Sequence, residues 1–362
     1  MRGSLFALLW LFSALASAAD SRADGPYVSL GNDSAWTARW VTDTKAIASK
    51  QTKAGDALEV AGVGALPSFQ VTLRPPGQPD PDEVALAPDT PFFVLADTHG
   101  EFEIAVALLQ KQHVIDSKLR WSFGKGHLAV LGDVFDRGAH QTEILWLLYE
   151  LEGEARLAGG GVHFVLGNHE AMAVGGDTRY LNPKYQEVAS LLGAPTYAAL
   201  FDATTLLGKW LRTKAAVVKV GGYLCLHGGL SRETVERKLT LKQINSDIRA
   251  ELGSLHPQGF VYAMSGPLWY RGYFAETGKD GFVVATAEDV AAVLSFYGAK
   301  AIFVGHTAVE TVTPLFDGRV VAVQVYPHRD ASTGAPVLEG LLVKKGHFYR
   351  ARIDGQLEEL KR

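Results

Sequence analysis

Five short segments of the sequence place histidine, aspartate or asparagine beside glycine, and each segment directly follows an apolar run. The segments are Asp97–Gly100, Gly132–Gly138, Gly167–Glu170, His227–Gly229 and Gly305–Thr307. Among them they carry three aspartates, one asparagine, four histidines and one arginine. Oxygen and imidazole donors in this mixture suit two divalent metal ions, and the planar guanidinium of an arginine suits a phosphate group.

The apolar runs before these segments predict the elements that must position them. Runs at 92–95, 128–131, 163–166, 223–226 and 301–304 have the length and continuity of buried strands. Helical patterns lie between strands at 101–114, 141–157 and 287–297, and Gly298 ends the last of them. This alternation predicts an α/β domain. Ligands of open α/β sheets gather at the carboxyl ends of strands, so we expect the five segments to converge.

The donor types also restrict the chemistry of the site. Carboxylate and amide oxygens mixed with imidazole favour Mn, Fe or Zn. The single cysteine, Cys225, excludes an intrachain disulfide and a cysteine-rich zinc module. Cys225 is not followed by the Cys-x5-Arg spacing of cysteine-dependent phosphatases, because Arg232 lies one residue too far along. Its place within an apolar strand predicts a buried, inert thiol.

The first nineteen residues predict a signal peptide. Met1-Arg2 is a positively charged start, Leu5 to Leu15 is almost entirely apolar, and Ala16-Ser17-Ala18 has the small residues of a cleavage site. The apolar run is shorter than the roughly 20 residues that span a bilayer, so we expect no stable membrane anchor. The mature protein is therefore expected to be periplasmic or secreted.

The remaining chain divides by composition into two parts. Residues 20–90 contain period-two alternation at 35–41 and 68–73, and they predict an N-terminal β-rich accessory segment. Residues 91–362 are expected to form the catalytic domain, with a helical insertion at about 171–215. A hairpin over 312–325 with its turn at Asp317-Gly318, then strands at 338–343 and 348–353, should complete the sheet. The formal net charge of −4 argues against a nucleic-acid partner.

The ordered set of five motifs resembles the signature of the calcineurin-like PPP-family metallophosphoesterases, and most of all the bacterial Shewanella-like protein phosphatases. The resemblance covers roughly residues 91–330, and Ala96 stands where the family usually has glycine. It implies the metallo-dependent phosphatase fold, an α/β architecture with a central β-sandwich flanked by helices.

The resemblance also implies roles for individual residues. Asp97, His99 and Asp133 would hold a first divalent ion, and Asp133, Asn168, His227 and His306 would hold a second. His169 would be the general acid, oriented by Asp136. Arg137 would bind phosphate oxygens, aided by Asn168 and by Arg271 in the loop Gly266–Arg271.

The implied activity is that of a phosphoprotein phosphatase, in which a hydroxide bridging the two metals attacks phosphorus directly. Substrates would be phosphorylated proteins or small phosphomonoesters, with phosphotyrosine one candidate. Aromatic residues of the insertion and of the loop Gly266–Arg271 would either contact an aromatic leaving group or belong to the core. They are Tyr180, Tyr185, Tyr197, Phe201, Trp269 and Tyr270. The alternatives are a dinucleoside polyphosphate hydrolase and a catalytically silent metal-binding scaffold.

Overall fold

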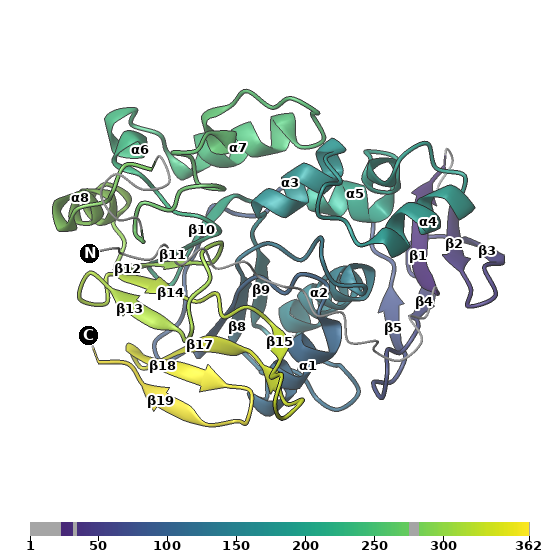
Figure 1. The fold of residues 1–362 in the computed structure, drawn as a ribbon, viewed down its shortest axis with the longest axis horizontal. Coiled ribbons are helices and arrows are strands. Elements are labelled where there is room, and N and C mark those ends of the chain that lie inside the picture. Colours follow the sequence, from purple (N-terminus) through teal and green to yellow (C-terminus); the bar gives the residue numbers. More distant parts are fainter. Residues whose placement is uncertain (1–22, 32–34, 275–281, 362) are drawn as a thin grey trace, which may run out of the picture.

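Two six-stranded sheets packed face to face form the centre of the molecule (Figure 1). The computed structural model describes residues 23–31, 35–274 and 282–361, so the predicted signal peptide lies outside the described residues. The first sheet has the order β19-β18-β17-β7-β8-β9, with strands Leu357–Glu359, His347–Arg352, Glu339–Lys344, Phe92–Leu95, His127–Val130 and Gly161–Phe164. The second has the order β13-β14-β12-β11-β10-β6, with strands Thr313–Leu315, Val320–Ala322, Ala301–Val304, Tyr223–Leu226, Val217–Val220 and Glu83–Val84.

The strands that precede the five motifs are parallel within each sheet. β7, β8 and β9 pair in parallel in the first sheet, and β11 pairs in parallel with β12 in the second. Antiparallel strands close the sheets, including β17–β18 and the hairpin β13–β14. The predicted α/β sandwich is confirmed, although β9 begins two residues before the predicted run.

The space between the sheets is filled by the apolar residues of these strands. Phe92 of β7 and Phe303 of β12 are fully buried, with ring centroids 6.3 Å apart across the interface. Cys225 of β11 lies in the same layer with no exposed surface, and burial raises the pKa of its thiol. The thiol is therefore protonated and inert at neutral pH, as its position in an apolar run predicts.

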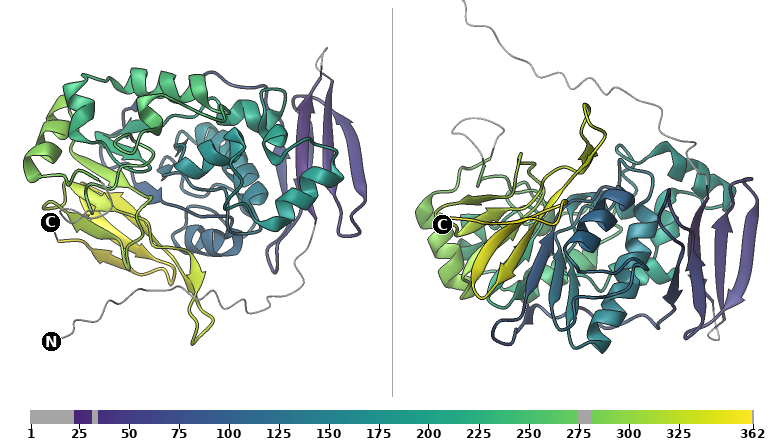
Figure 2. Two further views of the ribbon diagram at one scale, coloured as in Figure 1. Left: turned by 45° about the horizontal axis from the view of Figure 1, so that its top comes forward. Right: turned by 90° about the horizontal axis from the view of Figure 1, so that it is seen from below.

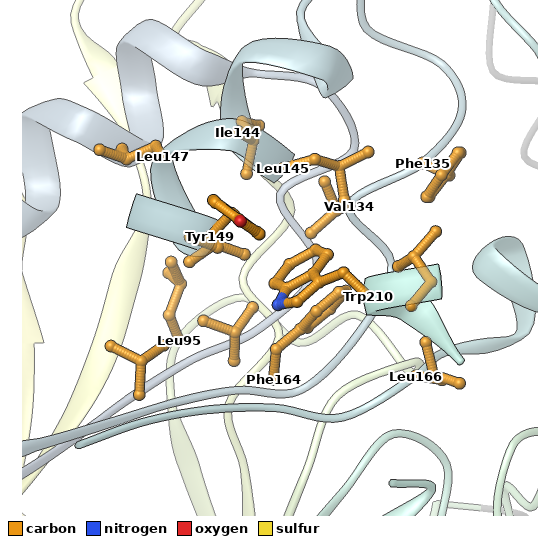
Figure 3. Close-up of a cluster of buried hydrophobic side chains, with 14 of the residues drawn as sticks. Leu95, Val134, Phe135, Ile144, Leu145, Leu147, Tyr149, Phe164, Leu166 and Trp210 are labelled. Carbon is orange, nitrogen blue, oxygen red and sulfur yellow. The ribbon is translucent and has the colours of Figure 1, made fainter. Parts of the chain in front are cut away.

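Helices cover the outer faces. α1 (Phe102–Lys111), α2 (Gln141–Leu157) and α8 (Ala287–Tyr297) correspond to the three predicted helices. α1 ends three residues early because His113 takes a positive φ of 57° and turns the chain away. Figure 3 shows how side chains of α2, among them Leu145 and Tyr149, pack against Leu95 and Phe164 from the first sheet and against Trp210.

The stretch after β9 is helical. It contains α3 (Asn168–Gly175), α4 (Pro183–Leu191), the 3₁₀ turn η2 (Tyr197–Phe201) and α5 (Leu206–Leu211). After β11 the chain adds α6 (Arg232–Glu236), α7 (Leu241–Glu251) and the 3₁₀ turn η3 (Phe260–Tyr262). Among the helices of the described residues, none is long and apolar enough to cross a membrane.

The N-terminal segment is rich in strands and lies at one end of the molecule (Figure 2). β1 (Asp24–Leu30), β2 (Trp36–Val41) and β3 (Ile47–Thr52) form one antiparallel sheet, and β4 (Ala57–Val60) pairs with β5 (Phe69–Thr72). The indole of Trp146 in α2 donates a hydrogen bond to the carbonyl of Pro26, at 2.8 Å. The segment is thus joined to the catalytic part by a buried contact. A small hairpin of β15 (His328–Arg329) and β16 (Pro336–Val337) projects from a different part of the molecule than the N-terminal segment (Figure 2).

Candidate active site

The five motifs converge around the carboxylate of Asp133. Its Oδ2 lies 3.7 Å from His99 Nε2, 3.8 Å from His169 Nε2 and 3.2 Å from His227 Nε2. Three of these side chains come from loops after β7, β8 and β11, and His169 comes from the first turn of α3 after β9, so the two sheets meet at this point. As whole residues, all four are at most 4% exposed. A carboxylate surrounded by three imidazoles is the arrangement that a shared metal ligand requires.

The backbone at the site is held in conformations that ordinary residues avoid. Asp97, His99, Asp133, Asp136 and His306 have positive φ angles of 31°, 43°, 52°, 71° and 62°. Such strain persists only where the surroundings enforce it, and it is concentrated at functional sites. Each of these residues follows the end of a buried strand, which supplies that enforcement.

Glycine is required where two of the motif loops touch. A Cβ on Gly167 would collide with the Asp133 carboxylate, and one on Gly138 would collide with the carbonyl oxygen of His99. The glycines of the motifs therefore allow the loops after β7, β8 and β9 to pack directly against one another.

The donor set fits divalent metal ions. The candidate ligands form two groups, and within each group the ligand atoms all lie within 4.8 Å of one another. The groups are His99–Asp133–His169 and Asp133–His227–His306. His99 and His227 use Nδ1 to bind the carbonyl oxygens of Phe135 and Leu131, at 3.0 and 2.7 Å, which leaves each Nε2 facing Asp133. His306 Nε2 is buried and has no hydrogen-bond partner among the described residues, as expected of an atom reserved for a metal.

The remaining predicted ligands lie beside these groups. Asn168 Oδ1 is 2.8 Å from His227 Nε2. Asp97 Oδ1 is 3.9 Å from His227 Nδ1, and the Asp97 carboxylate accepts the backbone N–H of His306 at 3.2 Å. All six residues predicted as ligands are therefore brought together. His169, predicted as the acid, also lies among the ligand-type atoms.

Burial and neighbouring charges shift the pKa values of the residues in this cluster in different directions. Burial raises the pKa of Asp97 to about 7. Burial acts in the same direction on Asp133, but the neighbouring histidines outweigh it and hold its pKa well below the usual range. Burial lowers the pKa of His99 to about 3 and that of His306 to about 2. In His227, Asp133 and Asp97 overcome burial and raise the pKa to about 9. The cluster thus contains the ionised carboxylate of Asp133 and the neutral imidazoles of His99 and His306, the forms that bind metal ions, whereas His227 must give up a proton to do so.

His169 and Asp136 form a tightly bonded pair. His169 Nδ1 lies 2.6 Å from Asp136 Oδ2, and this contact leaves Nε2 as the free ring atom. Burial lowers the pKa of His169, but Asp133 and Asp136 together more than reverse this and raise it. A histidine whose pKa is raised by neighbouring buried carboxylates is suited to donate a proton.

The two predicted phosphate-binding arginines lie beside different motifs, Arg137 in the second and Arg271 next to the fifth. Arg137 is exposed and follows Asp136 directly. Arg271 donates hydrogen bonds to the carbonyl oxygen of His306 at 2.9 Å and to Thr307 Oγ1 at 3.0 Å. Its guanidinium is therefore anchored beside the last motif, in the loop where the sequence places it.

Glu170 is a buried organiser of the motif loops. Its carboxylate accepts the backbone N–H groups of Gly167, Asp133, Val134 and Phe135 at 2.6, 2.8, 2.7 and 3.2 Å. It thereby fixes the turn that carries Asp133.

Aromatic residues near the site divide into two groups. Tyr185, Tyr197, Phe201 and Tyr270 are at most 3% exposed and belong to the core. Tyr180 is 47% exposed, and its ring centroid lies 5.2 Å from that of His169. Trp269 also reaches the site, 5.8 Å from the ring of His306.

Tyr326 is a site residue that the sequence does not predict. The guanidinium of Arg137 lies 5.9 Å from the ring of Tyr180 and 5.5 Å from the ring of Tyr326. Tyr326 also lies 5.9 Å from the ring of His99. It follows β14, far along the chain from its neighbours, and no local pattern marks it.

The comparisons with known proteins agree with this geometry. Residues 90–310 match the model of the calcineurin-like phosphoesterase family, so the chain belongs to that family, and the resemblance seen in the motifs is confirmed. Family and fold make it a metal-dependent phosphatase. The chain is similar to the crystal structure of a cold-active protein-tyrosine phosphatase from a psychrophilic Shewanella species. The two share 35% identity with a TM-score of 0.81, over 94% of this chain and 99% of that one.

Curated relatives extend the comparison. Shewanella-like protein phosphatase 2 of Arabidopsis thaliana is 25% identical over 68% of this chain and 73% of the relative. A symmetrical bis(5'-nucleosyl)-tetraphosphatase of Shewanella loihica is 34% identical, but over only 33% of this chain and 39% of the relative. The similarity to the protein phosphatases is thus the more extensive.

Proposed function

We propose that this chain is an exported phosphoprotein phosphatase that uses two divalent metal ions, Mn, Fe or Zn, to hydrolyse phosphomonoesters. The observation that carries the proposal is the placement of Asp133 Oδ2 among His99, His169 and His227, within 3.8 Å of a ring nitrogen of each. Asp97, Asn168 and His306 complete two adjoining ligand sets that share this carboxylate. The charged start and apolar run of residues 1–19 support export to the periplasm or beyond.

The residues of this chain have complementary tasks in the proposed reaction. Bound metal ions would supply Lewis acidity at the phosphoryl oxygens and lower the pKa of a water molecule. Arg137 and Arg271 neutralise the charge on the phosphoryl oxygens. His169 donates a proton from Nε2 to the leaving oxygen, and Asp136 holds the ring by Nδ1. Water is the nucleophile, so no phosphorylated side chain forms.

Within this function we propose a preference for phosphotyrosine. The exposed ring of Tyr180 and the ring of Tyr326 both lie within 6 Å of Arg137, so a phosphate bound there has aromatic surfaces beside it. Aromatic rings favour offset or edge contacts with another ring, and such contacts contribute about 0.5–1.5 kcal/mol beyond the burial of area. The tyrosine phosphatase named above adds support.

The test is the kcat/KM of the mature, manganese-loaded protein on matched phosphotyrosine and phosphothreonine peptides, with a dinucleoside tetraphosphate as a third substrate. A clear excess on phosphotyrosine is expected. Comparable rates on both peptides would contradict the preference and leave a broad phosphomonoesterase. Turnover of the dinucleotide alone would replace the proposal with a dinucleoside polyphosphate hydrolase. Tight metal binding without turnover of any substrate would indicate a silent scaffold.

A further inference from the structure

A buried ionic network joins the N-terminal strand β1 to the loop that carries Asp136 and Arg137. Asp24, in β1, has a side chain with no exposed surface, and its Oδ1 lies 3.3 Å from the ammonium nitrogen of Lys184 in α4. The other oxygen, Oδ2, accepts hydrogen bonds from Tyr27 and Thr142. The side chain of Lys184 is only 2% exposed. A buried ammonium requires a carboxylate partner, and the N-terminal segment provides one.

Lys184 transmits this contact to the loop. Its ammonium donates a hydrogen bond of 2.8 Å to the carbonyl oxygen of Ala139, two residues after Arg137. The nearby Glu143 lies farther from the ammonium, at 3.9 Å. The same region of the insertion also binds the backbone of Arg137. The N–H of Arg137 donates to the carbonyl oxygen of Tyr180 at 2.9 Å, and the carbonyl oxygen of Arg137 accepts from the side-chain amide of Asn182, also at 2.9 Å.

A second branch reaches Asp136. Its backbone N–H donates to Gln141 Oε1 at 2.6 Å, and the amide of Gln141 donates to the hydroxyl of Tyr197. Tyr197 packs on Phe201, which in turn contacts the ring of Tyr27 in β1, with centroids 5.2 and 6.1 Å apart. Both branches therefore run from β1 to the loop at 136–140.

We infer that Asp24 is a positioning residue for the active site, acting through Lys184 on the loop that carries Asp136 and Arg137. The N-terminal segment is then a working part of the enzyme, since it supplies the charge that keeps Lys184 bonded to Ala139. Neither residue belongs to the candidate metal ligands or the proposed phosphate-binding side chains. This role rests on the proposed phosphatase function.

The test uses the mature, manganese-loaded protein and four variants. Asp24→Asn and Lys184→Met break the contact from either end, and the double variant removes both charges. Glu187→Gln is the matched control: Glu187 also lies in α4 and pairs with Lys45 of the N-terminal segment at 2.7 Å, but both side chains are more than one third exposed. The measurements are kcat/KM on a phosphotyrosine peptide, the melting temperature, and the Kd for inorganic phosphate.

We expect Asp24→Asn and Lys184→Met each to lower kcat/KM by about tenfold or more and to weaken phosphate binding by about tenfold, because a charged hydrogen bond that positions Arg137 is lost. Glu187→Gln should stay within about twofold of wild type. The double variant should melt above Asp24→Asn, since no unpaired ammonium remains, but its kcat/KM should stay low because Ala139 still lacks its donor.

Two results would overturn the inference. One is a kcat/KM within twofold of wild type in both single variants. The other is a double variant that recovers activity together with melting temperature, which would indicate a stabilising role only. If the wild-type protein turns over no substrate, the proposed function fails, and the Kd for phosphate then decides the positioning role by itself: an unchanged Kd in both single variants would contradict it.

Discussion

At the scale of single residues, His169 is where two chemical roles compete. Its Nε2 lies 3.8 Å from Asp133 Oδ2 among metal-ligand atoms, yet its Nδ1 is bonded to Asp136 as a general acid requires. We expect His169→Asn to retain both metals and to lower kcat by about 10²- to 10⁴-fold. The loss should be larger for an alkyl phosphate than for an aryl phosphate, because the poorer leaving group depends more on protonation.

The measurement for His169→Asn is kcat on aryl and alkyl phosphates, together with metal content by elemental analysis. Loss of one metal would instead make His169 a ligand. Full turnover with both metals bound would refute the assignment as acid.

At the scale of elements, the adjacent strands β8 and β9 bring two histidines together. His127 Nδ1 and His163 Nε2 lie 2.8 Å apart, away from the metal-ligand cluster. Burial, with smaller effects from His127 and Lys214, lowers the pKa of His163 to about 3. The folded state therefore keeps His163 neutral, whereas the unfolded chain takes up a proton below about pH 6.5.

The sign of this linkage predicts loss of stability in acid. The contribution of His163 is complete above about pH 6.5 and declines as the pH falls toward 3, so up to about 2 kcal/mol is lost at pH 5. Urea unfolding of the wild-type protein and of His163→Gln, at pH 7 and at pH 5, measures this contribution to the free energy of unfolding. The free energy of unfolding should fall less in the variant than in wild type. An equal fall in both would contradict the prediction.

Elements with local signals are the ones that sequence reasoning locates well. α8 begins with the capping box of Thr286 and Asp289 and ends at Gly298, whose φ is 57°, so both boundaries are visible in the sequence. Asp317 and Gly318 likewise have the positive φ angles, 55° and 74°, of the predicted hairpin turn. The sequence does not predict β1, because Gly25 and Pro26 interrupt the alternation of apolar and polar residues. The segment forms a strand through its antiparallel pairing with β2.

The same distinction applies to the site. The glycine-bounded motifs identify the ligand-type residues, because each motif follows an apolar run that predicts a buried strand. Contacts made at long range, such as Tyr326 with Arg137 or Asp24 with Lys184, leave no pattern in the sequence. They depend on how the insertion and the N-terminal segment pack against the sandwich.

At the scale of the whole molecule, the candidate metal ligands belong to both halves of the sandwich. Asp97, His99 and Asp133 follow strands of the first sheet, and His227 and His306 follow strands of the second. Metals bound there would tie the two sheets together at their shared edge. A ligand that binds only the folded state stabilises it by about 2.7 kcal/mol when present at a hundredfold excess over its Kd.

Removal of metals should therefore weaken the sandwich as a unit. We expect a chelator to lower the melting temperature and to increase amide hydrogen exchange after β7 and β8 and after β11 and β12 together, with both effects reversed by Mn²⁺. His306→Ala is the control, because a protein that lacks this ligand should respond less to chelator. If exchange rose in the loops of one sheet only, the metals would not bridge the two halves. The sandwich would then be held at this edge by its apolar interior alone.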